Sequence, residues 1–133
     1  MSAVAADTHS LIWYLDSPGN LSVTALAALR RAESAGDSIY ISAISIVEIV
    51  YLVEKARLPA AALVSVTRAV QDPGSAVVVV PLEAHVASAV QLIPRSMVPD
   101  MPDRIIAATA LHVGVPLVTR DARIRASTIA TIW

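Results

Sequence analysis

Short apolar stretches alternate with longer helix-like segments along this chain of 133 residues, and this alternation constrains the fold more than any other feature. Strands that alternate with helices favour a parallel sheet with helices on both faces. The expected fold class is therefore α/β, a three-layer α/β/α arrangement in a single domain over residues 1–133. The expected strands cover residues 3–6, 39–41, 76–80, 115–119 and 128–132. The expected helices cover residues 9–15, 22–35, 42–57 (from Ser42 or Ser45), 59–70, 83–92, 103–113 and 120–125. The valine-rich stretch 76–80 has the pattern of a strand that is covered on both faces.

Composition narrows the classes of function. The formal net charge is −1, so any nucleic-acid site must be a local patch. The chain has no Cys, which excludes a disulfide framework and thiolate metal sites and fits the cytoplasm. Hydrophobic residues make up 56% of the chain, yet no apolar run is long enough to cross a membrane. The surplus of apolar residues therefore predicts a large core and a partner interface.

Acidic residues are scarce, and four of them stand where an apolar stretch ends or a helix begins: Asp7, Glu48, Asp103 and Asp121. The carboxyl ends of parallel strands meet at one edge of a sheet, so these side chains are expected to converge there. Converging carboxylates repel one another unless a cation lies between them. Oxygen ligands of this kind suit Mg²⁺ or Mn²⁺.

Each acid also has a structural interpretation. Asp7 can cap the following helix, and Ser45 with Glu48 has the spacing of a capping box. Asp100 and Asp103 bracket a helix start and would favour its dipole. Asp121 can end its strand in a turn. The sequence leaves both interpretations open for each residue taken alone.

Four motifs in order carry a resemblance that covers nearly the whole chain. They are residues 6–13 (ADTHSLIW), 42–49 (SAISIVEI), 99–110 (PDMPDRIIAATA) and 117–121 (LVTRD). Together they are similar to PIN-domain proteins, and more narrowly to VapC-type toxins of bacterial toxin–antitoxin pairs. The resemblance implies the same parallel α/β fold.

The resemblance also implies an activity. It makes Asp7, Glu48, Asp103 and Asp121 the ligands of one or two divalent cations, Mg²⁺ or Mn²⁺. The implied reaction is hydrolysis of single-stranded or loop RNA, which leaves a 5′-phosphate and a 3′-hydroxyl. Supporting roles fall on Thr119, Asp100, Thr8 and Ser45. One departure is Val98, which stands where close relatives often carry a histidine.

Two further groups of residues are candidates for binding. Arg104, Arg120 and Arg123 crowd the same end as the acids and are candidates for contacts with the RNA backbone. The apolar residues beside Asp7 predict a groove for a partner protein: Leu11, Ile12, Trp13 and Tyr14. The resemblance implies that this partner is a VapB-type antitoxin, in a homodimer or a hetero-oligomer.

Two alternatives stay open. One is a PIN nuclease that acts in RNA processing or on flap DNA without an antitoxin. The other is a non-catalytic scaffold that binds RNA or protein. A phospho-receiver domain is disfavoured because the single lysine, Lys55, does not follow the last site strand. The chain also lacks a glycine-rich phosphate loop and a Gly-x-Ser-x-Gly hydrolase motif.

Overall fold

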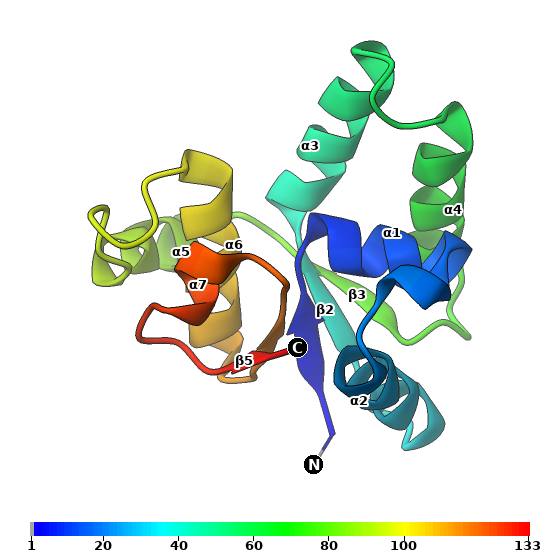
Figure 1. Cartoon of the computed structure of the whole chain (residues 1–133), viewed down its shortest axis with the longest axis horizontal. Coiled ribbons are helices and arrows are strands. Elements are labelled where there is room, and N and C mark those ends of the chain that lie inside the picture. Colours follow the sequence, from blue (N-terminus) through cyan, green and yellow to red (C-terminus); the bar gives the residue numbers. More distant parts are fainter. Residues whose placement is uncertain (1) are drawn as a thin grey trace.

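The computed structural model describes residues 2–133, whose strands form one parallel sheet (Figure 1). The strands are β1 (Val4–Ala6), β2 (Ile39–Ser42), β3 (Val77–Val80), β4 (Leu117–Val118) and β5 (Thr131–Ile132), and they pair in the order β3-β2-β1-β4-β5. The order reverses at β1, whose neighbours β2 and β4 follow it on opposite sides. In open α/β sheets the ligand site lies outside the carboxyl ends of the strands at such a point.

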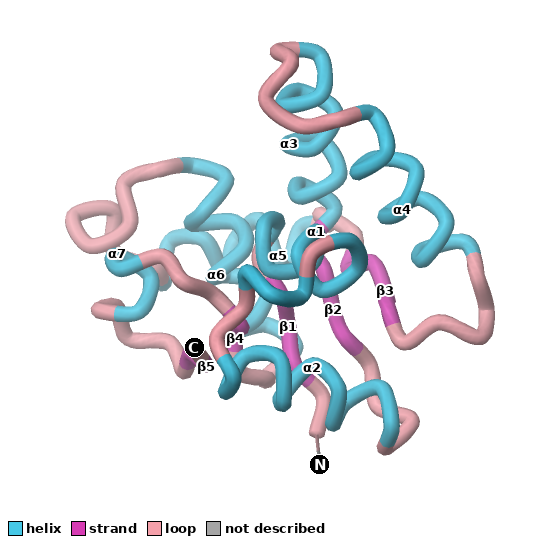
Figure 2. Tube along the Cα trace, turned by 45° about the vertical axis from the view of Figure 1, so that its right-hand side comes forward, coloured by secondary structure: helices cyan, strands magenta, loops and turns pink. Residues whose placement is uncertain are grey.

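Helices cover both faces of this sheet, which agrees with the three-layer arrangement predicted from the sequence. They are α1 (Thr8–Asp16), α2 (Val23–Ser34), α3 (Ala43–Glu54), α4 (Ala60–Gln71), α5 (Ala84–Ala89), α6 (Met101–Val113) and α7 (Ala122–Arg125). Two 3₁₀ turns cover Pro18–Asn20 and Val90–Leu92. Helices α1, α2 and α4 lie on one side of the strands, and α5, α6 and α7 lie on the other (Figure 1). The helix pair α3 and α4 extends away from the sheet (Figure 2).

Alternation along the strands divides the core in two. Val4 and Ala6 pack into the cluster beneath α1, α2 and α4, whereas Ala5 between them packs against α6. In β4, Leu117 and Val118 likewise point to opposite clusters. Successive side chains of a strand point to opposite faces, so a sheet covered on both sides needs apolar residues at every position. This explains why the central strands read as continuous apolar runs.

The valine-rich strand β3 corrects one expectation. It was expected to be covered on both faces, but it is an edge strand beside β2. Val77 is buried, whereas Val78 is 40% exposed. An edge strand and a central strand can have the same composition, because β-branched residues fit either one. The run of valines therefore predicts a strand, but it does not predict whether that strand is central or at the edge of the sheet.

Helix ends follow local chemistry. The Ser22 hydroxyl accepts a hydrogen bond from the backbone N–H of Ala25 at 3.0 Å and caps α2. Gly114 ends α6 in the left-handed conformation, at φ 75°. Ala56 has φ 56°, and helix α3 stops just before it, three residues earlier than the sequence predicted.

Within residues 2–133, no helix combines the length and apolar character that a membrane crossing requires.

Candidate active site

Asp7 and the segment that follows β4 meet at the carboxyl edge of the sheet. Ala6 pairs with Val118, and the Asp7 backbone N–H donates to the Val118 carbonyl at 3.1 Å. The buried Thr119 hydroxyl then donates to Asp7 Oδ2 at 2.5 Å and accepts from the Asp121 backbone N–H at 3.1 Å. One hydroxyl thus holds two of the predicted acids in place. The predicted supporting position of Thr119 therefore has a direct structural basis.

Three acids each use one carboxylate oxygen to cap a helix. Asp7 Oδ1 accepts from the Ser10 N–H at 2.9 Å and starts α1, and Asp121 Oδ1 accepts from the Ile124 N–H at 2.9 Å and starts α7. Asp100 Oδ2 accepts from the Asp103 N–H at 3.1 Å and starts α6. Each cap leaves the second carboxylate oxygen of that residue outside the capping bond. An acid can therefore cap a helix and also join the other acids at the sheet edge, although the sequence offered these roles as alternatives.

Glu48 reaches the site by a different route. The N-cap of α3 is Ser42, whose hydroxyl accepts from the Ile44 N–H at 3.2 Å, so the predicted capping box of Ser45 with Glu48 is wrong. Glu48 Oε1 instead accepts from the buried Thr8 hydroxyl at 2.6 Å. That hydroxyl also lies 3.0 Å from Ser45 Oγ. Thr8 and Ser45 therefore tie α1 to α3 beside this carboxylate, and their supporting roles stay predictions.

The electrostatics show how strongly these carboxylates act on one another. Burial, followed by the charges of Asp100, Asp121, Glu48 and Asp7, raises the pKa of Asp103 to about 7. Burial also raises the pKa of Glu48, and the hydrogen bond from Thr8 opposes that rise. A carboxyl group with a pKa near neutrality is a mark of a functional cleft. A bound cation would offset the repulsion among these carboxylates, which is the second cause of the raised pKa of Asp103.

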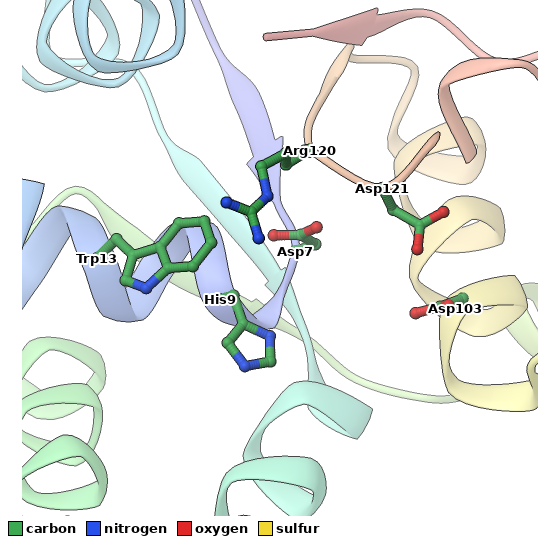
Figure 3. Close-up of a pocket in the computed structure, with 6 residues that line it drawn as sticks. All are labelled: Asp7, His9, Trp13, Asp103, Arg120 and Asp121. Atoms are coloured by element: carbon green, nitrogen blue, oxygen red, sulfur yellow. The ribbon is translucent and has the colours of Figure 1, made fainter. Parts of the chain in front are cut away.

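A cleft of about 240 Å³ opens over these residues, with Asp7 between the aromatic side and the other two acids (Figure 3). Its lining consists of Asp7, His9, Trp13, Asp103, Arg120 and Asp121. Glu48 lies to one side and lines a neighbouring groove between α3 and the start of α6. Three of the four predicted acids therefore share the cleft itself.

The donor chemistry of the cleft fits a divalent cation. Within residues 2–133, no three acidic, histidine or cysteine side chains stand close enough to hold one ion by themselves. Mg²⁺ commonly takes only one or two protein carboxylates and keeps several of its waters. The spacing of the acids therefore suits a hydrated hard cation better than an all-protein cage.

The three candidate arginines have different environments. Arg104 is partly buried, and its guanidinium donates to the Ile93 carbonyl at 2.8 Å and to the Val90 carbonyl at 3.1 Å. It fixes the turn before α6, and its predicted role in RNA contact stays a prediction. Arg120 stands in the cleft, 5.1 Å from the centre of the Trp13 ring. Arg123 is exposed on α7 and remains a candidate.

The predicted partner groove at residues 11–14 is wrong for two of its four members. Leu11 is fully buried, and Ile12 is 6% exposed, so both belong to the core. Tyr14 donates to the Glu33 carboxylate on α2, and burial raises its pKa. Trp13 lines the acidic cleft. Leu11 and Ile12 lie on the side of α1 that packs into the core.

The structure adds two features that the sequence did not assign. Trp133 lies against Trp13, with ring centres 6.2 Å apart. Its position follows from β5 pairing in parallel with β4, which carries the chain end to the same edge as Thr119. The second feature is the groove of about 390 Å³ beside Glu48, where Val47, Tyr51 and Met101 are exposed. Val47 and Tyr51 are apolar residues on the solvent side of α3, and that is the signal in the sequence.

A parallel α/β sheet with acids at its switch point defines the class, and the PIN domain family model matches residues 4–128. The chain belongs to the PIN-domain family. Ribonuclease VapC22 of Mycobacterium tuberculosis is 34% identical over 125 residues, which are 94% of this chain and 92% of that protein.

Solved structures share the fold. VapBC2 from Rickettsia felis, bound to a DNA fragment from its promoter, has a TM-score of 0.68 at 14% identity, over 98% of this chain and 99% of that chain. FitAcB from Neisseria gonorrhoeae has a TM-score of 0.62 at 22% identity, over 96% and 95%. A toxin–antitoxin complex from Klebsiella pneumoniae has a TM-score of 0.59 at 22% identity, over 92% and 90%.

Proposed function

We propose that this protein is a metal-dependent endoribonuclease that acts as the toxin of a toxin–antitoxin pair. The observation that carries the proposal is the cleft in which Asp7, Asp103 and Asp121 gather at the switch point of the sheet. The raised pKa of Asp103 supports it, because it reflects the burial of this carboxyl first and the negative charges around it second. The homologous protein named as a ribonuclease supports the substrate class.

The proposed role of each residue of the site follows from its position in the cleft. Asp7, Asp103 and Asp121 would hold Mg²⁺ or Mn²⁺, directly or through water, with Glu48 at the side. Such a cation lowers the pKa of water and offsets charge on a phosphodiester. Thr119 and Thr8 orient Asp7 and Glu48 through their hydroxyls. Attack of water on phosphorus, with the 3′ oxygen leaving, gives a 5′-phosphate and a 3′-hydroxyl.

Metal binding and RNA cleavage test this function together. The double variant Asp7→Asn/Asp103→Asn should lose Mn²⁺ binding in calorimetry and should lose cleavage of an unpaired RNA. Asn at position 7 keeps a capping oxygen, so the fold should survive. The control Glu54→Gln/Glu83→Gln removes the same charge at exposed sites and should behave as the wild type. Cleavage that persists in EDTA would overturn the metal proposal, whereas Mn²⁺ binding without cleavage would favour a non-catalytic module.

An antitoxin partner is the second part of the proposal. One structural neighbour, from Klebsiella pneumoniae, is described as a toxin–antitoxin complex. In this chain the groove beside Glu48 exposes Tyr51 by 58% and Met101 by 65%. Large exposed apolar side chains that gather in a groove mark a protein interface. The groove adjoins an acid of the site, so a partner seated there would lie close to the cleft.

Co-expression with the gene that adjoins this one in the genome, if it encodes a small protein, tests this partner. Tyr51→Ala should weaken the purified complex roughly thirtyfold, in the range of an aromatic hot spot. Val64→Ala, a 51% exposed position on α4, is the matched control and should leave the complex unchanged. Equal binding by both variants, with normal folding, would place the interface elsewhere.

A further inference from the structure

We propose that the aromatic wall of the cleft, defined as Trp13, Trp133, His9 and Arg120, is a stacking site for one unpaired nucleobase of the bound nucleic acid. This inference rests on the proposed function for the phosphate that the acids engage. It adds a subsite for the base beside that phosphate. The wall comes from three separated parts of the chain, namely α1, the segment after β4, and the residue that follows β5.

The wall is a connected set of flat side chains. The Trp13 ring centre lies 6.2 Å from that of Trp133 and 5.7 Å from that of His9. The Arg120 guanidinium lies 5.1 Å from the Trp13 centre. These separations are those of aromatic pairs and cation–π contacts. His9 and Trp13 stand one helical turn apart on α1, so both present their rings to the same side.

Three members of the wall line the same cleft as the acids. Trp13, His9 and Arg120 stand opposite Asp103 and Asp121, with Asp7 between the two sides (Figure 3). A packing role alone explains the contact of Trp13 with Trp133. It does not explain why His9 and Arg120 are exposed and extend this aromatic surface along the cleft. A ligand with an anionic group and a flat ring would contact both sides at once, and a nucleotide has both.

The geometry favours a base that has left its helix. A base within a duplex is covered on both faces by its neighbours and offers no free face to Trp13. Proteins read unpaired bases by stacking them on aromatic rings and on arginine planes. An unpaired base would extend the Arg120–Trp13 stack, whereas a fully paired duplex would contact the cleft through its backbone alone.

Intrinsic fluorescence reports on this wall directly, because the two tryptophans of the chain are Trp13 and Trp133. We would titrate the Asp103→Asn protein, in which cleavage is stopped, with an unpaired oligoadenylate. The matched probe is an oligomer of the same length and charge with abasic sites. The oligoadenylate should quench the fluorescence and bind roughly fivefold to a hundredfold more tightly than the abasic probe, as expected of base–aromatic stacking.

Variants separate stacking from charge and from folding. Trp13→Phe keeps a ring and should stay within a few-fold of the parent affinity, whereas Trp13→Leu should approach the affinity for the abasic probe. Arg120→Lys keeps the charge without the plane and should weaken oligoadenylate binding but not abasic binding. Arg123→Ala removes an exposed charge outside the wall and should weaken both probes equally. Circular dichroism verifies the fold of each variant.

Two outcomes would overturn the stacking site. One is equal binding and equal quenching by the abasic probe, which would leave only backbone contacts. The other is unchanged oligoadenylate affinity in both Trp13→Leu and Arg120→Lys. Cleavage by the wild-type protein is measured separately with Mn²⁺. Stacking without cleavage would reject the nuclease and retain the base site, and cleavage without stacking would do the reverse.

Discussion

At the scale of single residues, the cleft depends on carboxylates that are held close together at a cost to stability. The pKa of Asp103 rises to about 7 because the side chain is partly buried and four other carboxylates act on it. In the unfolded chain this group titrates near its ordinary pKa of 3.8. The folded protein therefore binds more protons than the unfolded chain between about pH 4 and pH 7.

The sign of the pH dependence follows from that difference. The stability of the metal-free protein should fall as the pH rises through this window, because the folded state must give up a proton that it binds tightly. Asp103→Asn should raise the melting temperature at pH 8 by a few degrees, on the order of 1 kcal/mol after allowance for solvent screening. At pH 4 it should have little effect. Thermal melts of both proteins in EDTA at the two pH values check this, and a variant that is less stable at pH 8 would contradict it.

Thr119 carries a separate prediction at this scale. Its buried hydroxyl bonds to Asp7 Oδ2 and to the Asp121 N–H. Thr119→Val removes the hydroxyl and leaves a partly buried oxygen and a partly buried N–H without that partner, at a cost of about 1–3 kcal/mol at most. Thr119→Ser keeps both bonds and should cost less than half as much. Urea denaturation curves measure both, and equal losses would show that the methyl group matters rather than the hydroxyl.

At the scale of elements, the two helices that follow β1 and β4 at the carboxyl edge, α1 and α7, each carry an acidic cap. Asp121 starts α7 through the N–H of Ile124, and Asn can serve at that position as well as Asp can. Asp121→Asn should therefore leave the metal-free stability unchanged or slightly raised. Asp121→Ala removes the same charge and also the cap, so it should be less stable than the Asn variant by about 1 kcal/mol. Equal melting temperatures for the two variants would contradict the capping role.

The extent of prediction from sequence differed between elements. Strands and helices were predicted to within a few residues, because apolar runs, Ser22 and Gly114 signal their ends locally. The order of strands could not be predicted, since the same valine run fits an edge or a centre. Arg104 was assigned to RNA because charge is visible in the sequence, while the carbonyls that it satisfies come from a turn more than ten residues away.

The candidate site was predicted better than its surroundings. Asp7 and Asp121 followed from the rule that parallel strands end at one edge, which needs no knowledge of strand order. Leu11 and Ile12 were assigned to a groove because an apolar run in a short helix does not say which of its sides faces the sheet. The pairing of Glu48 with Thr8 was not predicted, because the two residues lie 40 positions apart and no local pattern joins them.

At the scale of the whole molecule, a cation that binds only the folded state should stabilise all of it. At a Mn²⁺ concentration of about 100 times Kd, the added stability should be about 2.7 kcal/mol. Differential scanning fluorimetry should show a melting temperature that rises with Mn²⁺. Asp7→Asn/Asp103→Asn should show no such rise, and a rise of the same size in that variant would place the ion outside the cleft.

The acidic caps have a consequence for how this sequence can change over generations. Serine and asparagine can each start a helix as aspartate does. Single changes of Asp7 or Asp121 to either residue would thus remove a charge from the cleft while the architecture survives. If selection for the proposed cleavage ended, descendants of this protein would keep the fold and its grooves. The proposed cleavage is the property that such changes would remove first, and a folded protein is what would remain.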